Sequence, residues 1–378
     1  MSNYKGDSVS AGSSPLARLL HAAIERNAGW LPFDRFMAMA LYAPGLGYYA
    51  NASVKFGQMP SSGSDFVTAP ELSPLFGRAL ARQVAQALQA SGTRAVIEFG
   101  AGSGALAAQL LGALGALDAL GDLVERYTIV DLSGQLRERQ RERLAVFGDK
   151  IAWVDALPEA IEGVVVGNEV LDAMPVQLLH FDGRSWFERG VVTAGAGFAW
   201  HDRLTLLRPP FDGPFAPGSV TEIHPQAEAF ITTLAERLTR GAAFFIDYGF
   251  PAAEYYHPQR DGGTLMCHRA HLADTDPLAD VGLKDITAHV DFTGIALAAQ
   301  AAGLDVLGYA TQAHFLMNCG LLEMLEGADL KTTANAQKLL TEHEMGELFK
   351  VIGFARGCGA AFNEAPIGFA RGDRTHTL

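Results

Sequence analysis

Short apolar runs alternate with helical patterns through the middle of the chain. The stretches between the runs carry strong helix formers, as in 105–111 and 133–147. Apolar runs of this length that are separated by helices are typical of a parallel sheet with both faces covered. The pattern therefore predicts an α/β fold with strands at 95–99, 127–131, 151–154, 163–167 and 242–247.

One central stretch and both ends of the chain depart from this alternation. Residues 176–201 alternate apolar and polar positions around Asp182-Gly183, which predicts an inserted antiparallel hairpin. Amphipathic spacing predicts helices near the N-terminus, and the last third is expected to hold two strands around a helical excursion. The expected helices are 15–27, 33–42, 74–89, 225–239, 292–302, 315–326 and 336–352, and the expected late strands are 304–311 and 366–371.

The length of 378 residues is large for one minimal α/β domain, so we expect a main domain with additions. The expected division is a disordered N-terminus over 1–14, a helical and lid segment over 15–90, and the main domain over 91–378. Insertions into the main domain are expected at about 176–220 and 313–357.

A glycine-rich turn follows the first of the predicted strands. Gly100, Gly102 and Gly104 remove three side chains where the strand passes into a helix, so backbone can approach a ligand closely. Open α/β sheets bind nucleotides at such turns, with the amides of the helix N-terminus facing the ligand. The spacing also fits the loose dinucleotide fingerprint, so the glycines alone leave S-adenosylmethionine and NAD both open.

Two acidic residues favour S-adenosylmethionine. Glu98 lies beside the turn, where a carboxylate would repel a pyrophosphate but would suit an ammonium and a sulfonium. Asp131 ends the next predicted strand and is placed to hydrogen-bond ribose hydroxyls, which both cofactors carry. The expected cofactor contacts, which include a lid over 64–71, are Thr68, Pro70, Glu98, Gly100, Ala101, Gly102, Gly104, Asp131, Leu132, Ser133 and Asn168.

Asn168, Glu169 and Asp172 directly follow the apolar run 163–167 and are the candidate catalytic residues. They fall at the mouth of the predicted sheet, next to the place where a transferable methyl group would be presented. Paired carboxylates can hold a planar guanidinium in bidentate fashion. The alternative is that Asn168 and Asp172 cap a following helix, with Glu169 at its positive end.

Composition narrows the partners. The formal net charge of −13 argues against a large phosphate-binding surface, so no nucleic-acid partner is expected. The three cysteines and the eleven histidines show no metal-ligand spacing, so no metal is expected. The most apolar stretch, 105–124, is broken by glycine and aspartate, and 1–14 lacks the features of a signal peptide. We therefore expect no membrane span, cytoplasm as the default location, and a chain that could form a homodimer.

The chain resembles the MidA-like family of S-adenosylmethionine-dependent methyltransferases, which includes a mitochondrial protein arginine methyltransferase. The resemblance covers nearly everything from Phe33 to Leu378, and its motifs are 65–71, 98–104, 168–175, 246–249, 263–265 and 285–292. It implies a seven-stranded Rossmann-like methyltransferase domain that binds S-adenosylmethionine through Glu98, the three glycines and Asp131. Relatives often hold Glu where this chain has Asp131, which keeps the charge but has a shorter reach.

The resemblance implies methylation of a protein side chain, with the arginine guanidinium first among the candidates. Two other functions stay open at this point. One is a factor that binds S-adenosylmethionine for assembly or regulation without strong catalysis. The other is an NAD-dependent oxidoreductase, for which the sequence offers no hydride-transfer site beyond the glycine turn.

Overall fold

The computed structural model describes residues 14–51, 67–117, 123–131 and 133–378. The chain forms two compact units, each built from separate stretches of sequence. Unit 1 comprises 1–54, 174–225 and 256–288, and unit 2 comprises 55–173, 226–255 and 289–378. The predicted boundary at residues 90 and 91 falls inside unit 2, because the helix before it packs against the sheet.

Unit 2 is built on a sheet whose strands run in the order β15-β16-β10-β5-β2-β3-β4. The five strands from β10 to β4 are parallel, and β16 is antiparallel to both of its neighbours. The predicted seven-stranded methyltransferase sheet is therefore confirmed; a short strand, β14 (Val290–Asp291), also pairs with β10. The bounds are β2 Ala95–Phe99, β3 Arg126–Val130, β4 Ile151–Val154, β5 Ile161–Asn168, β10 Leu238–Phe250, β15 Asp305–Thr311 and β16 Phe349–Arg356.

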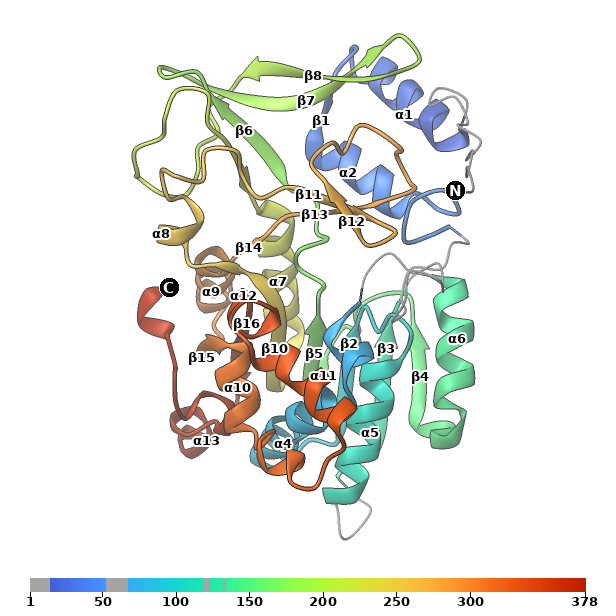
Figure 1. Cartoon of the computed structure of the whole chain (residues 1–378), viewed down its shortest axis with the longest axis vertical. Coiled ribbons are helices and arrows are strands. Elements are labelled where there is room, and N and C mark those ends of the chain that lie inside the picture. Colours follow the sequence, from blue (N-terminus) through green and yellow to red (C-terminus); the bar gives the residue numbers. More distant parts are fainter. Residues whose placement is uncertain (1–13, 52–66, 118–122, 132) are drawn as a thin grey trace. The chain divides into compact units, whose positions relative to one another are not determined.

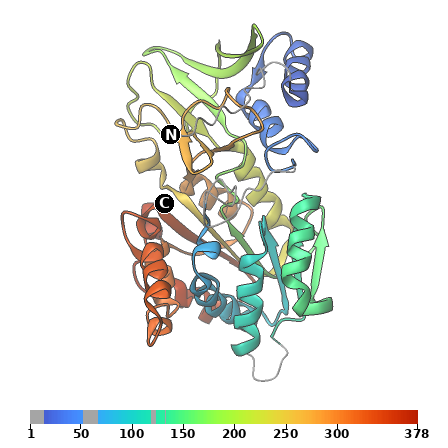
Figure 2. The same cartoon turned by 45° about the vertical axis from the view of Figure 1, so that its right-hand side comes forward.

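Helices cover both faces of this sheet. On one face, α4 (Pro74–Ser91) and α5 (Ala105–Leu117) share a buried core with Val164 and Val166 of β5. On the other face, α7 (Pro225–Arg237) brings Phe230 to 5.1 Å from the ring of Phe99 and 5.9 Å from the ring of Phe245. Figures 1 and 2 show α5 and α7 on opposite sides of the strands. Strands buried on both faces explain the continuous apolar runs.

In the C-terminal part of unit 2, two of the expected elements differ from those in the structure. The expected helix 336–352 is wrong, because the chain leaves α12 at Leu348 and enters β16, a strand inside the sheet. The expected strand 366–371 is also wrong, because residues 367–369 form a 3-10 turn. The side chain of Phe369 in this turn packs so closely on Gly308 of β15 that a Cβ added at Gly308 would lie 2.3 Å from it. The remaining elements of unit 2 are α3 Ala69–Leu72, α6 Gly134–Leu144, α8 Ala252–Tyr255, α9 Phe292–Ala301, α10 Gln312–Asn318, α11 Leu330–Leu340, α12 Met345–Leu348, α13 Ala360–Glu364 and the 3-10 turns η2 Ala145–Lys150, η3 Glu323–Leu325, η4 Ile367–Phe369 and η5 Thr375–Thr377.

Unit 1 is mainly antiparallel. The predicted hairpin around Asp182-Gly183 joins β6 to β7 in a five-stranded sheet. A three-stranded sheet of β11, β12 and β13 lies in a stretch where the sequence analysis expected no strand. These three strands are too short to show an alternation of apolar and polar positions, so the sequence pattern did not predict them. The bounds are α1 Pro15–Arg26, β1 Leu31–Pro32, α2 Phe33–Tyr42, β6 Gln177–Phe181, β7 Trp186–Ala194, β8 Gly197–Leu204, β9 Val220–Ile223, β11 Met266–Arg269, β12 Leu272–Asp274 and β13 Asp285–Thr287.

Within the described residues, no helix has the length and apolar character needed to cross a membrane. The expected N-terminus 1–14 lies outside the described residues apart from Ser14, which caps α1 by accepting a hydrogen bond from the Ala17 N–H.

Candidate functional site

The predicted site residues of unit 2 gather at the carboxyl ends of the parallel strands. Glu98 lies in β2 beside the glycine turn, Asp131 follows β3, Asn168 ends β5, and Asp247 lies near the end of β10. Because these strands are parallel neighbours, their carboxyl ends meet at one edge of the sheet, where open α/β sheets bind ligands (Figure 1).

The glycine turn has the backbone that its sequence requires. Gly100, Gly102 and Gly104 have φ values of 61°, 52° and 81°, in the left-handed region that favours glycine. A Cβ added at Gly100 would lie 3.2 Å from Cγ2 of Val170, so a side chain there would crowd the loop after β5. The turn is therefore a bare backbone cradle, and its shape fits a ligand that approaches closely.

Glu98 is buried, with 2% of its surface exposed, and its Oε2 accepts a 2.7 Å hydrogen bond from the hydroxyl of Tyr127. Burial raises the pKa of Glu98 from 4.5 to about 8, the Tyr127 hydroxyl lowers it, and the nearby Asp131 raises it. The protein alone therefore holds Glu98 largely protonated at neutral pH, and a cation bound beside it would favour the charged form.

This burial predicts a pH dependence of stability. Because the pKa of Glu98 is raised in the folded state, its contribution is fully present below pH 4.5 and is lost as the pH rises through about 8. Urea unfolding of the wild type and of Glu98→Gln from pH 5 to 8.5 measures it. We expect the wild type to lose stability relative to the variant, by up to about tenfold in the folding equilibrium per pH unit. Parallel curves for the two proteins would contradict the raised pKa.

Asp131 is tied to the glycine turn by Gln140 of α6. Its Oδ1 accepts the N–H of Ser133 at 2.8 Å, and its Oδ2 accepts Nε2 of Gln140 at 2.8 Å. The same Nε2 donates to the carbonyl of Gly102 at 2.9 Å, and Trp153 donates to Oε1 of Gln140 at 2.9 Å. Gln140 was missed by the sequence analysis, because an isolated glutamine in a charged helix carries no pattern.

A loop after β5 carries the candidate catalytic residues, and Asp247 organises it. Oδ2 of Asp247 accepts the backbone N–H groups of Val170, Leu171 and Asp172 at 3.1, 2.9 and 3.2 Å. Glu169 has a φ of 54°, which is a strained conformation for a residue other than glycine. Strained backbone of this kind persists where the surroundings fix it and is concentrated at functional sites.

The loop places two acids and an amide together. Asn168 donates through Nδ2 to Oε1 of Glu169 at 2.8 Å, and the hydroxyl of Tyr248 donates to Oδ2 of Asp172. Oδ1 of Asn168 and Oδ1 of Asp172 are buried and have no hydrogen-bond partner among the described residues. Buried acceptors without partners are costly, so they are suited to a ligand that brings N–H donors.

Burial sets the protonation of these acids. It raises the pKa of Asp172 to about 6, while the Tyr248 hydroxyl lowers it. Burial also raises the pKa of Asp247, and the charges of Asp172 and Glu169 add to this effect. A proton acceptor with a pKa near neutrality is thus available at the site.

The alternative that Asn168 and Asp172 cap a following helix is wrong, since no helix follows Asn168 and the next element is β6.

The other predicted contacts have varied surroundings. Thr68 precedes α3 without capping it through its side chain, and the carbonyl of Pro70 accepts Nε2 of Gln109 at 2.7 Å. Ala101, between Gly100 and Gly102 in the turn, is buried and belongs to the core, and Ser133 caps α6. Leu132 lies outside the described residues, as do residues 64–66 of the expected lid.

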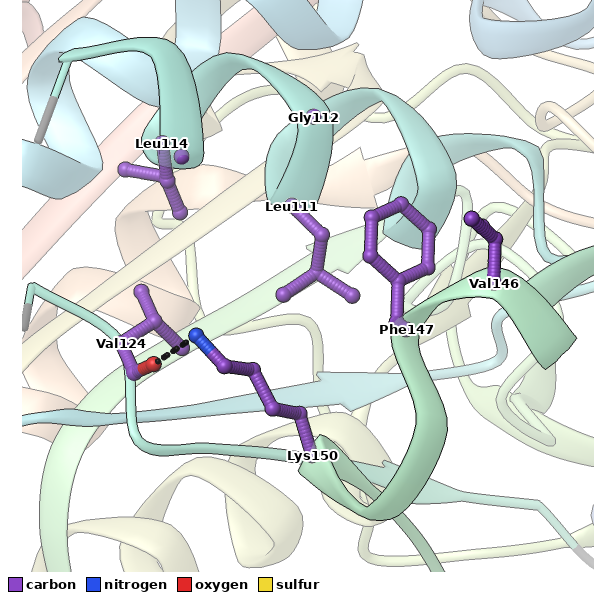
Figure 3. Close-up of a pocket in the computed structure, with 8 residues that line it drawn as sticks. Leu111, Gly112, Leu114, Val124, Val146, Phe147 and Lys150 are labelled. Atoms are coloured by element: carbon purple, nitrogen blue, oxygen red, sulfur yellow. Dashed lines mark hydrogen bonds between the residues drawn. The ribbon is translucent and has the colours of Figure 1, made fainter. Parts of the chain in front are cut away.

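Figure 3 shows a pocket of about 380 Å³ lined mainly by apolar side chains of α5 and η2, with Nζ of Lys150 donating to the carbonyl of Val124. Val124 precedes β3 and Lys150 precedes β4, so this pocket lies at the amino edge of the sheet. None of the predicted site residues lines it. The described residues also contain no group of three or more His, Cys, Asp or Glu that could hold a metal ion.

Residues 79–310 match the model of Methyltransf_28, a family of S-adenosyl-L-methionine-dependent methyltransferases. The chain belongs to this family. The methyltransferase is also similar to two crystal structures of COG1565 superfamily proteins from Burkholderia thailandensis, each covered in full by the alignment. One, bound to S-adenosyl-homocysteine, is 52% identical with a TM-score of 0.92. The other is 50% identical with a TM-score of 0.88.

These matches confirm the expected fold, the MidA-like resemblance and S-adenosylmethionine as the cofactor. The alternative of an NAD-dependent oxidoreductase is set aside. The residues fit the cofactor, since the methyltransferase has a glycine cradle for close approach and a buried acid beside it whose charged form a cation would favour. Which side chains contact the cofactor stays a prediction.

Curated relatives cover most of the methyltransferase at lower identity. The protein arginine methyltransferase NDUFAF7 of Xenopus laevis is 26% identical over 86% of this chain and 81% of the relative. The Mus musculus protein of the same name is 27% identical over 89% and 83%. Both relatives are mitochondrial, which overturns the expectation of a cytoplasmic protein.

Proposed function

We propose that the methyltransferase methylates the guanidinium of an arginine side chain in a protein. The observation that carries the proposal is the loop after β5, where the charges of Glu169 and Asp172 both act on Asp247. In this loop, Oδ1 of Asn168 and Oδ1 of Asp172 are buried without partners among the described residues. A guanidinium brings five N–H donors in a plane and a permanent positive charge, and it matches both features.

Each residue of the loop has a part in this proposal. When bound, S-adenosylmethionine would supply a methyl group attached to a positively charged sulfur, so that the methyl carbon can pass to an acceptor nitrogen as its bond to sulfur breaks. Glu169, oriented by Asn168, holds the guanidinium through charge-assisted hydrogen bonds. Asp172, with a pKa near 6, accepts the proton that the methylated nitrogen releases. Holding the attacking nitrogen in line accounts for much of the rate.

The curated relatives support the choice of arginine. Those named above are protein arginine methyltransferases, and the alignments with them include the candidate loop. Lysine is a weaker fit, because an ammonium is a point charge that does not use paired acceptors in a plane. A role limited to binding S-adenosylmethionine would leave the unpartnered oxygen of Asp172 without a use, because Asp172 is not among the expected cofactor contacts.

Labelled S-adenosylmethionine tests the proposal directly. The methyltransferase is incubated with the labelled cofactor and a cell lysate, and the modified proteins are hydrolysed to amino acids. We expect the label in methylated arginine. Label found only in small molecules, or only in methyl-lysine, would remove arginine as the acceptor.

A further inference from the structure

Glu71 is the last residue of the expected lid 64–71 and was not named as a contact residue, but it is bonded to the glycine turn. Its Oε1 accepts a hydrogen bond from the hydroxyl of Ser103, the residue before Gly104. The same oxygen accepts Nη1 of Arg143 at 2.9 Å, and Nη1 of Arg143 also donates to Oγ of Ser103 at 2.6 Å. These three side chains, which we term the Glu71 clasp, join α3, the glycine turn and α6.

The helix that carries Glu71 is fastened from two other sides. The carbonyl of Pro70 accepts Nε2 of Gln109 from α5, and the carbonyl of Leu72 accepts Nδ2 of Asn335 from α11 at 3.0 Å. A single turn of four residues would be marginal alone, but these bonds fix its position. Glu71 can therefore act on the turn as an anchored group, with 14% of its side chain exposed.

We propose that Glu71 is a positioning residue, which holds the glycine turn through Ser103 in the conformation that binds S-adenosylmethionine. Gln140 holds the same turn by a different route, through the carbonyl of Gly102. Ser103 lies between two glycines with positive φ, so little in the turn's own sequence fixes its backbone, and the clasp supplies the restraint.

A clasp of this kind changes cofactor affinity more than the chemical step. A loosened turn must be ordered when the cofactor binds, and that entropy reduces affinity. The candidate proton acceptor lies on another loop, fastened by Asp247, so kcat does not depend on the clasp. The inference rests on the placement of the cofactor at the glycine turn and is independent of the identity of the methyl acceptor.

Calorimetry with S-adenosylhomocysteine tests the clasp without any acceptor. We expect Ser103→Ala to raise the Kd about tenfold, because it removes both hydrogen bonds of the Ser103 hydroxyl. Glu71→Gln should raise it about threefold, because the amide oxygen can still accept these hydrogen bonds but without the negative charge. In assays of methyl transfer, KM for S-adenosylmethionine should rise with kcat within twofold of the wild type. Glu138→Gln is the matched control. Glu138 also pairs with an arginine of α6, Arg141, at 3.1 Å, but this pair is exposed.

Two outcomes overturn the proposal. One is an unchanged Kd in both Glu71→Gln and Ser103→Ala, and the other is a lowered kcat with KM unchanged. If Glu71→Gln does not fold, the Kd of Ser103→Ala decides, since it removes only a hydroxyl. Loss of arginine methylation with normal binding of S-adenosylhomocysteine would instead count against the proposed function.

Discussion

Asp172→Asn is expected to lower kcat for methyl transfer by about 10²- to 10⁴-fold, the usual range for loss of a general base. An amide cannot accept the proton that the methylated nitrogen releases. The Kd for S-adenosylhomocysteine should change little, because the expected cofactor contacts lie mainly in the glycine turn and directly after β3. Single-turnover assays beside calorimetry separate the two effects.

The pH profile gives this prediction a second readout. The pKa of Asp172 is about 6, so kcat should rise with pH through about 6 as the carboxylate becomes charged. The Tyr248 hydroxyl lowers that pKa by donating to Oδ2, so Tyr248→Phe should move the rise to higher pH. Tyr309→Phe is the control, since Tyr309 is buried on β15 and its hydroxyl has no partner among the described residues. A profile that Tyr248→Phe leaves unchanged would argue against Asp172 as the proton acceptor.

The candidate site could be predicted as far as it is local in sequence. The glycine turn and the acids after β5 stand beside apolar runs, and an α/β sheet puts the residues after such runs at one edge. The partners of these residues are not local. Asp247 is 75 residues from Asp172, and Glu71 is 32 residues from Ser103. No periodicity links such pairs, so only the folded chain reveals them.

The fold shows the same division. Strands such as β2 are mostly apolar and lie between two helices, so their existence follows from the pattern. Residues 349–352, the first half of β16, were read as the end of a helix, because a strand buried on both faces has a continuous apolar run without alternation. Its place between β10 and β15 depends on pairing with residues at least 39 positions away, which hydrophobic spacing does not encode.

Asp247→Asn is expected to disable methyl transfer by at least about a hundredfold although residue 247 need not touch the acceptor. Its two carboxylate oxygens accept four backbone N–H groups, three from the loop after β5 and one from Tyr248. Asparagine has one acceptor oxygen, so its NH₂ group must face at least one of these donors, whatever the charge of the original acid. A buried N–H without an acceptor costs about 1–3 kcal/mol.

The lost hydrogen bonds destabilise the observed conformation of the loop after β5. Glu169 has a left-handed backbone, and the N–H groups fixed by Asp247 belong to the three residues that follow it. When these bonds weaken, Glu169 can relax to negative φ, which moves its carboxylate away from the position proposed for holding the acceptor. Glu169→Gly tests the separate role of the side chain, because glycine accepts this φ without strain but brings no carboxylate.

A matched control distinguishes this effect from general damage. Asp182 also accepts two backbone N–H groups, from Arg184 and Ser185, but in the hairpin of unit 1. Asp182→Asn should leave kcat within twofold of the wild type. If Asp247→Asn unfolded at lower urea concentration yet kept full kcat, Asp247 would be a stabilising residue only. Because the loop keeps its acids together only while its backbone is held, we expect kcat to fall far more than cofactor affinity.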